Sequence, residues 1–143
     1  GRRENFAFRH ADVLFLGLNI IGGIKGGGKD NDWDDREKDC MEWSRTQISL
    51  HSSHDDNNNG YDEPLRAIIV FGHANKYGDV LESIARSARK LGVPALYVHG
   101  SGHTWKLERP LGGGMPNYHR VQVDQGGNAP PIRVTVRGTS VHA

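Results

Sequence analysis

Four short apolar runs along the chain predict β-strands. Phe6 and Phe8 alternate with polar neighbours, which is the period of a strand with one buried face. Residues 13–21, VLFLGLNII, are almost all apolar, as in a strand that is buried on both faces. Shorter apolar runs at 68–71 and 95–98 predict two further buried strands.

Two other segments have the apolar spacing of helices. In residues 39–50, Asp39 and Glu42 have the spacing of a capping box, which predicts a helix that begins there. One face of this helix would carry Cys40, Trp43, Gln47 and Leu50. Asp79 is placed to cap a second helix, which ends before Gly92. Its apolar stripe would consist of Val80, Leu81, Ile84, Ala85, Ala88 and Leu91.

The C-terminal part of the chain predicts two more strands, at 119–125 and 131–138. Their valines and Ile132 alternate with polar residues, which favours a half-buried antiparallel pair. The predicted order is therefore strand, strand, helix, strand, helix and three strands. This order indicates an α/β domain with a mixed β-sheet and two main helices.

Length and charge restrict the class of protein. The 143 residues suit a single domain spanning 1–143. The net charge is only +1 and the basic residues are scattered, so the charge pattern favours no nucleic-acid partner. No apolar run is long enough to predict a membrane span. Cys40 is the only cysteine, so no internal disulfide can form.

Two polar segments, 24–38 and 51–64, are predicted to be flexible loops. The first is rich in glycine, and the second is rich in Asp, Asn, Ser and His. Within the second, the stretch HSSHDD at 51–56 has histidines three residues apart followed by two carboxylates, which could bind a cation. A solvated loop is the favoured interpretation, because nothing nearby predicts a rigid arrangement of these side chains.

Histidines follow two of the predicted buried strands. His73 ends the run VFGHAN, and His99 and His103 lie in the glycine-rich stretch HGSGHTW. The strand–helix–strand segment 68–98 predicts two parallel strands, whose carboxyl ends lie at the same edge of the sheet. Ligands of open α/β sheets bind at that edge, and imidazole is a good metal ligand. Alternatively, each histidine could be a structural residue, and His99 could orient a ligand rather than be one.

Five segments together resemble the C-terminal half of a calcineurin-like metallophosphoesterase: DVLFLGLNIIGG, DCMEWSRTQ, IIVFGHAN, PALYVHGSGHTW and YHRVQVDQGGNAPPIRVTV. The resemblance implies part of an αββα sandwich with divalent metal ions, such as Zn, Mn or Fe, at the strand ends. His73 matches a lone histidine ligand of that family. Gly102 and His103 match the first half of its Gly-His-x-His motif, but Trp105 stands where the second histidine belongs. His99 could take that place.

The acidic motifs of that family are absent from this sequence: Asp-x-His, Gly-Asp-x-x-Asp and Gly-Asn-His-Asp/Glu. A two-metal hydrolase needs acidic oxygens to hold its cations. The resemblance therefore implies phosphomonoester or phosphodiester hydrolysis only if an N-terminal half completes the domain. The alternative is a non-catalytic structural or assembly subunit derived from the same fold. In both cases we expect the rest of its own protein, copies of the chain or other subunits to cover an open sheet face.

Overall fold

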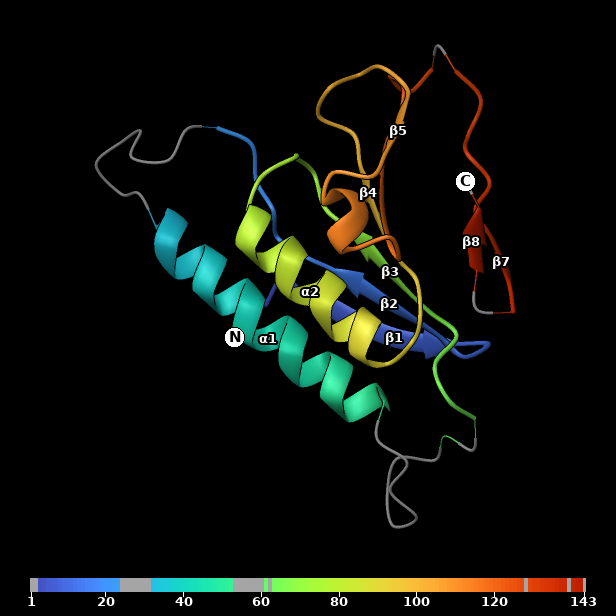
Figure 1. Cartoon of the computed structure of the whole chain (residues 1–143). Helices are drawn as coiled ribbons and strands as arrows, with labels where there is room; N and C mark the ends of the chain where they lie inside the picture. The colour runs from blue at the N-terminus through green and yellow to red at the C-terminus, as the bar shows by residue number, and fades with distance from the viewer. Residues whose placement is uncertain are drawn as a thin grey trace.

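The computed structural model describes residues 3–23, 32–52, 61, 63–127, 129–138 and 140–142. These residues form a mixed α/β fold, as the sequence predicts. A six-stranded sheet carries two long helices, and a separate two-stranded sheet follows near the C-terminus (Figure 1).

Four central strands of the large sheet are parallel. In chain order its strands are β1 (Phe6–His10), β2 (Val13–Gly17), β3 (Ala67–Phe71), β4 (Ala95–His99), β5 (Lys106–Glu108) and β6 (Tyr118–Gln122). In space the order is β1-β2-β3-β4-β6-β5, and only the edge strands β1 and β5 are antiparallel to their neighbours. Ala11 and Asp12 both have positive φ, which suits the tight turn from β1 to β2. The predicted strands around Phe6 and Phe8, at 68–71 and at 95–98 are confirmed, whereas the strand predicted at 13–21 ends at Gly17.

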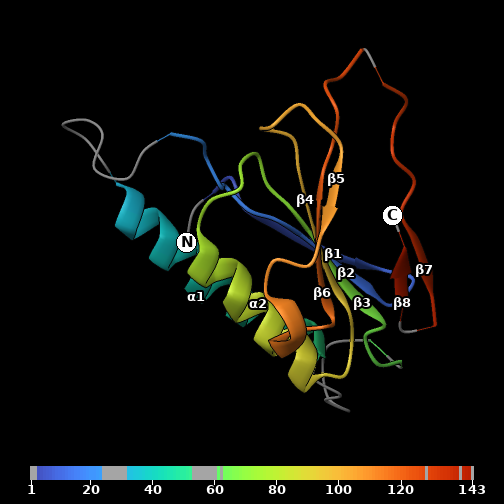
Figure 2. The same cartoon turned by 45° about the horizontal axis from the view of Figure 1, so that its top comes forward.

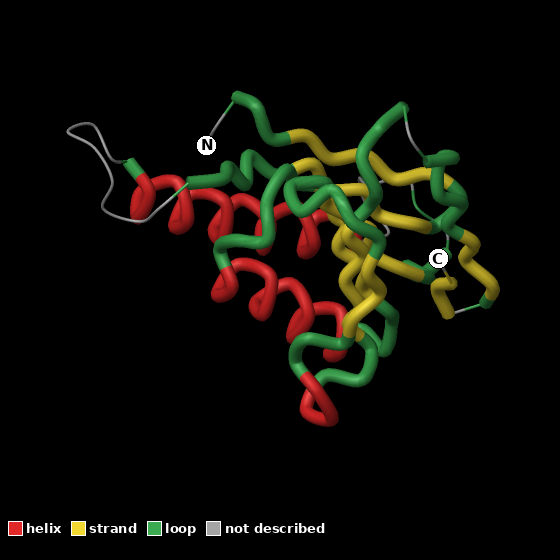
Figure 3. Tube along the Cα trace, turned by 90° about the horizontal axis from the view of Figure 1, so that it is seen from above, coloured by secondary structure: helices red, strands yellow, loops and turns green. Residues whose placement is uncertain are grey.

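Helices α1 (Trp33–Ser52) and α2 (Gly78–Lys90) pack side by side on one face of the sheet (Figures 2 and 3). The apolar stripe of α2 is buried there, as its spacing predicts. The main core includes Leu14, Leu16, Ile68, Val70 and Tyr97 from the strands and Val80, Ile84, Ala85 and Ala88 from α2. A short 3-10 turn, η1 (Gly112–Gly114), lies near the end of α2, where the Arg89 guanidinium donates to the Gly114 carbonyl.

The other face of the sheet is only partly covered. Strands β7 (Thr135–Arg137) and β8 (Ser140–His142) lie on that side (Figure 2). Val134 and Val136 pack against a small cluster formed by Val13, Ala67 and Ile69. The part of this face that carries Phe6, Phe8 and Phe71 lies outside that cluster.

Four phenylalanines from β1, β2 and β3 stack across this second face. They are Phe6, Phe8, Phe15 and Phe71, and we call them the aromatic strip. Neighbouring ring centroids are 6.3, 4.8 and 6.5 Å apart, and the rings are nearly parallel. Phe6 is 50% exposed, Phe8 48% and Phe71 39%, which is unusual for adjacent large apolar side chains.

The first helix is longer than its sequence pattern predicts. It begins at Trp33 and ends at Ser52, so residues 33–38 and 51–52 are helical and the predicted loop boundaries are wrong there. Two acidic residues in the first turn, Asp34 and Asp35, favour the helix N-terminus electrostatically. Trp33 is buried, with its ring edge-on to Tyr77 at 4.8 Å between centroids. Of the remaining predicted loop residues, 24–31, 53–60 and 62 lie outside the described residues, and residues 32, 61, 63 and 64 lie outside helices and strands.

The predicted helix caps are also wrong. Asp39 lies inside α1, and Asp79 lies in the first turn of α2, whose N-cap is Tyr77. Leu50 and Leu91, which were expected on buried helix faces, are 49% and 39% exposed. The buried face of α1 contains Cys40, as predicted, together with Trp33, Ser44 and Ile48. Because this buried face includes the polar residue Ser44, the spacing of apolar residues did not indicate it.

The predicted pairing of the two C-terminal strands is wrong as well. β6 pairs with β4 in parallel and with the short strand β5 in antiparallel, whereas β7 pairs with β8. The position beside β4 buries Tyr118 and Val121 almost completely. An exposed antiparallel pair would leave one side of both residues in water, so the central position is favoured.

Candidate functional site

The loops after β2, β3 and β4 meet at the carboxyl edge of the sheet, around the backbone of His73. Its amide N–H donates to the carbonyl of Ile20 at 3.2 Å. Its carbonyl accepts from the amides of Gly100 and Ser101, at 3.2 and 3.0 Å. The parallel pairing of β3 with β4 confirms that both histidine-bearing loops lie at this edge, as the crossover argument predicts.

Gly72 allows these loops to approach one another. A Cβ atom at this position would lie 2.5 Å from the hydroxyl oxygen of Tyr97 and 3.1 Å from Cβ of Ile20. Tyr97 is completely buried, and its hydroxyl donates to the carbonyl of Ala74 at 2.6 Å. The glycine therefore fixes the course of the chain on both sides of His73.

His73 and His103 both present exposed imidazoles on loops at this edge. His103 has a φ of 53°, and its amide N–H donates to the carbonyl of Gly100 at 3.4 Å. A left-handed backbone conformation is uncommon for a residue other than glycine and is often found at functional positions. The structure thus places the two histidines on neighbouring loops.

His99 differs from these two because it is buried. It is 2% exposed, and its ring stacks on Tyr97 at 5.3 Å between centroids. Neither ring nitrogen has a hydrogen-bond partner among the described residues. Burial lowers the pKa of His99, and the nearby Arg120 guanidinium lowers it further, although Glu108 opposes this effect. The neutral imidazole is therefore favoured.

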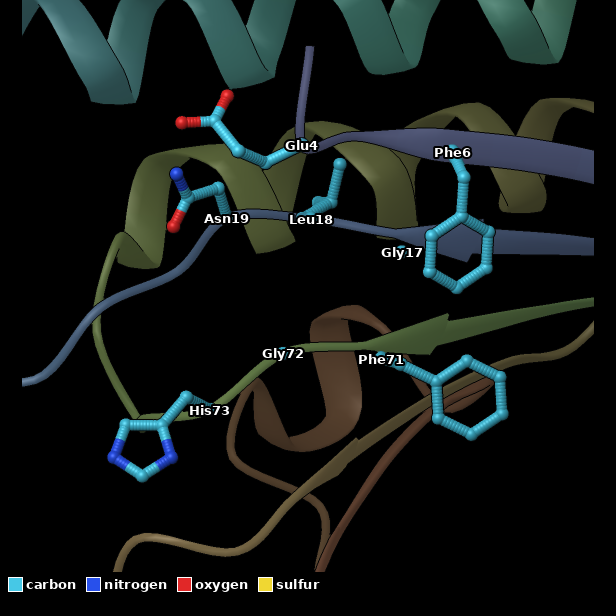
Figure 4. Close-up of a pocket in the computed structure, with 8 residues that line it drawn as sticks. All are labelled: Glu4, Phe6, Gly17, Leu18, Asn19, Phe71, Gly72 and His73. Carbon is cyan, nitrogen blue, oxygen red and sulfur yellow. The ribbon is translucent and has the colours of Figure 1, made fainter. Parts of the chain in front are cut away.

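An open cleft of about 310 Å³ lies between the ends of β2 and β3, and His73 borders it (Figure 4). The side chains of His73, Asn19 and Glu4 lie toward one end of this cleft, whereas Phe6 and Phe71 lie toward the other. The cleft therefore has a polar end, with groups able to bind a cation or accept and donate hydrogen bonds, and an aromatic end.

The sequence interpretation did not include Glu4 or Asn19 in the site. Asn19 interrupts the apolar run 13–21, and this could have marked it as a residue beyond the strand end. Its amide N–H donates to the side-chain oxygen of Asn5 at 2.8 Å, which ties the start of β1 to the end of β2. Nothing in the local sequence around Glu4 indicates its position, since that follows from the β1–β2 pairing.

The donor set at this edge does not form a complete metal centre. Across the described ranges, no group of three or more His, Cys, Asp or Glu side chains is arranged to hold a metal ion. Two exposed imidazoles on neighbouring loops could contribute to a metal site, but a two-metal hydrolase also needs several carboxylates. The assignment of His73, His103 and His99 as metal ligands therefore stays a prediction.

Comparisons with known proteins give no family. No protein-family model, curated protein or solved structure matches this chain. Among the described residues, neither helix combines the length and the apolar character that crossing a membrane requires.

Proposed function

We propose that this chain is the C-terminal part of a metallophosphoesterase-related domain. In this proposal His73 and His103 each contribute one ligand to a divalent metal site, such as Zn, Mn or Fe, at the carboxyl edge of the sheet. An N-terminal half that completes the domain would supply the acidic ligands. Hydrolysis of phosphomonoesters or phosphodiesters would then require the completed domain.

The observation that carries this proposal is the junction of the two histidine-bearing loops. Two backbone hydrogen bonds to the His73 carbonyl hold the loop after β4 against the loop after β3. The side chains of His73 and His103 remain exposed, so both are accessible to an ion. His99 fits better as a buried neighbour of this site than as a ligand, because it is 2% exposed and stacks on Tyr97.

A non-catalytic assembly subunit is the alternative, and the aromatic strip favours it. Phe6, Phe8 and Phe71 are each more than a third exposed and form a continuous apolar surface with Phe15. Surfaces of this kind commonly mark contacts with other proteins. The missing acidic motifs fit this alternative equally well.

Zinc titration of the full chain by calorimetry tests the metal site. We expect the wild-type chain to bind zinc. Each of the variants His73→Ala and His103→Ala should bind zinc at least roughly tenfold more weakly than the wild type, a loss of about 1.4 kcal/mol. The matched control is His10→Ala, since His10 is exposed at the end of β1 that pairs with Val13, away from the carboxyl ends of the parallel strands. This control should bind zinc as the wild type does.

Zinc affinity that is unchanged in both variants would contradict the proposed ligands. Binding at 51–56, the other histidine-containing stretch considered from the sequence, would give this result. Loss of affinity in His99→Ala alone, with His73→Ala and His103→Ala unaffected, would also contradict the assignment. Circular dichroism of each variant shows whether the fold is intact, so that a loss of zinc binding can be told from a loss of folding.

A further inference from the structure

Gly17 interrupts the aromatic strip. In the register of the sheet it lies between Phe6 on β1 and Phe71 on β3, so these three positions form one row on the same face. Phe15 precedes Gly17 by two residues on β2, and its side chain therefore lies on that face as well. Three phenylalanines thus border a position of the sheet that has no side chain.

The two phenylalanines of this row stay accessible. The ring of Phe6 leans over Gly17, since a Cβ atom at Gly17 would overlap that ring. Phe6 is nevertheless 50% exposed, and Phe71, on the other side of Gly17, is 39% exposed. Both rings lie at the aromatic end of the cleft of about 310 Å³ that His73 borders (Figure 4). This end of the cleft is therefore open to a ligand.

The geometry of the strip favours a flat aromatic ligand. Its neighbouring rings are stacked, with interplanar angles of 12°, 11° and 7°. Phe6 and Phe71 are the two ends of this series, and among the described rings each stacks on one neighbour. A further planar ring beside them could continue the stack at the usual spacing of about 4.5–7 Å between centroids. An aliphatic group would gain only the burial of its surface.

The other end of the cleft favours a cation. Glu4 is exposed and belongs to no ion pair among the described residues. No lysine or arginine is among the described residues that line the cleft. Asn19 adds a side-chain carbonyl oxygen, and a neutral His73 imidazole could accept a hydrogen bond. A carboxylate with neighbouring acceptors complements an ammonium group, which donates three hydrogen bonds.

We propose that this cleft binds a small aromatic amine, with its ring beside Phe6 and Phe71 and its ammonium group at Glu4. Because Glu4 and Phe6 are two residues apart, their Cα atoms are separated by no more than about 7 Å. A short aliphatic chain between the ring and the nitrogen is enough to reach both ends. These contacts involve no metal ion, so this site does not depend on the proposed metal ligands.

NMR titration of the full chain with phenethylamine tests the proposal. The amide signals of Gly17, Leu18 and Gly72 should shift and saturate, with a dissociation constant on the order of 1 mM, because the ligand is small and the cleft is open. Phenethyl alcohol lacks the charge, and propylamine lacks the ring. Each of these two analogues should bind at least about threefold more weakly than phenethylamine.

Substitutions at the two ends of the cleft should act separately. Phe71→Leu should weaken phenethylamine binding about threefold to tenfold, because a ring contact is lost. Glu4→Gln should weaken it at least about threefold but leave the binding of phenethyl alcohol unchanged. The matched controls are Phe8→Leu, since Phe8 belongs to the strip but not to the lining of the cleft, and Glu42→Gln, which is 65% exposed on α1. Both controls should bind phenethylamine as the wild type does.

The proposal requires only the part of the strip at Phe6 and Phe71 to stay accessible. Both Glu4 and Phe71 are exposed, so their variants should fold, and the amide spectrum of each variant shows whether it does. Equal affinity for phenethylamine and its two analogues would overturn the proposal, as would unchanged affinity in Phe71→Leu and Glu4→Gln. A second copy that covers this part of the strip would give a dimer by light scattering and no amide shifts, and that result would also overturn it.

Discussion

Replacing Gly72 by alanine should lower the free energy of unfolding by about 2–6 kcal/mol. The new Cβ would lie 2.5 Å from the hydroxyl oxygen of Tyr97, which is fully buried, so the two groups must move apart within a packed core. Overpacking of this kind costs about 1–3 kcal/mol, and the displaced hydroxyl would lose its bond to Ala74, which costs a further 1–3 kcal/mol or so. Urea denaturation of both proteins measures the difference.

Gly113→Ala is the matched control for this substitution. Nothing lies within 4 Å of a Cβ atom built at Gly113, so its stability should change by less than about 1 kcal/mol. If Gly72→Ala were as stable as the wild type, the close approach of the loops around His73 would be wrong. Zinc titration of Gly72→Ala then shows whether that approach also positions His73.

The chain should associate through the aromatic strip at micromolar concentration. Covering a few hundred Å² of apolar surface stabilises a complex by several kcal/mol at about 25 cal/mol per Å². This is comparable to the whole stability of a small domain, roughly 5–15 kcal/mol. The triple variant Phe6→Ser, Phe8→Ser and Phe71→Ser should therefore have the mass of a monomer by light scattering, whereas the wild type should not.

Leu50→Ser controls for a general loss of apolar surface. Leu50 is 49% exposed on α1, on the opposite side of the sheet from the aromatic strip. This variant should associate as the wild type does. A wild-type chain that is a stable monomer with one sharp unfolding transition would show that the strip needs no partner, and the expectation of a covering chain would be wrong.

The fold could be predicted where the apolar pattern is continuous. Residues 13–17 of the run 13–21 form β2, and the runs at 68–71 and 95–98 lie in β3 and β4. The stripe after Asp79 lies in α2. The sequence could not indicate β5, because three residues are too few to show a period. The partner of β6 was mispredicted because alternation shows which face is buried but not which strand lies beside it.

Parts of the site could be predicted for the same reason. His73 and His103 were expected at one edge because parallel strands align their carboxyl ends, and their loops do meet there. The cleft beside His73 could not be predicted, because Glu4 reaches it only through the pairing of β1 with β2.

Hydrolysis of p-nitrophenyl phosphate and its bis ester by the isolated chain tests the central claim most directly. The proposal is that this chain supplies only part of a metal-dependent site, because its sequence lacks the acidic motifs of the family it resembles. With manganese or zinc in excess, the account predicts a rate no higher than that of the free metal ion in buffer. Robust turnover that is abolished in His103→Ala would contradict the account and would show that the chain holds a complete catalytic centre.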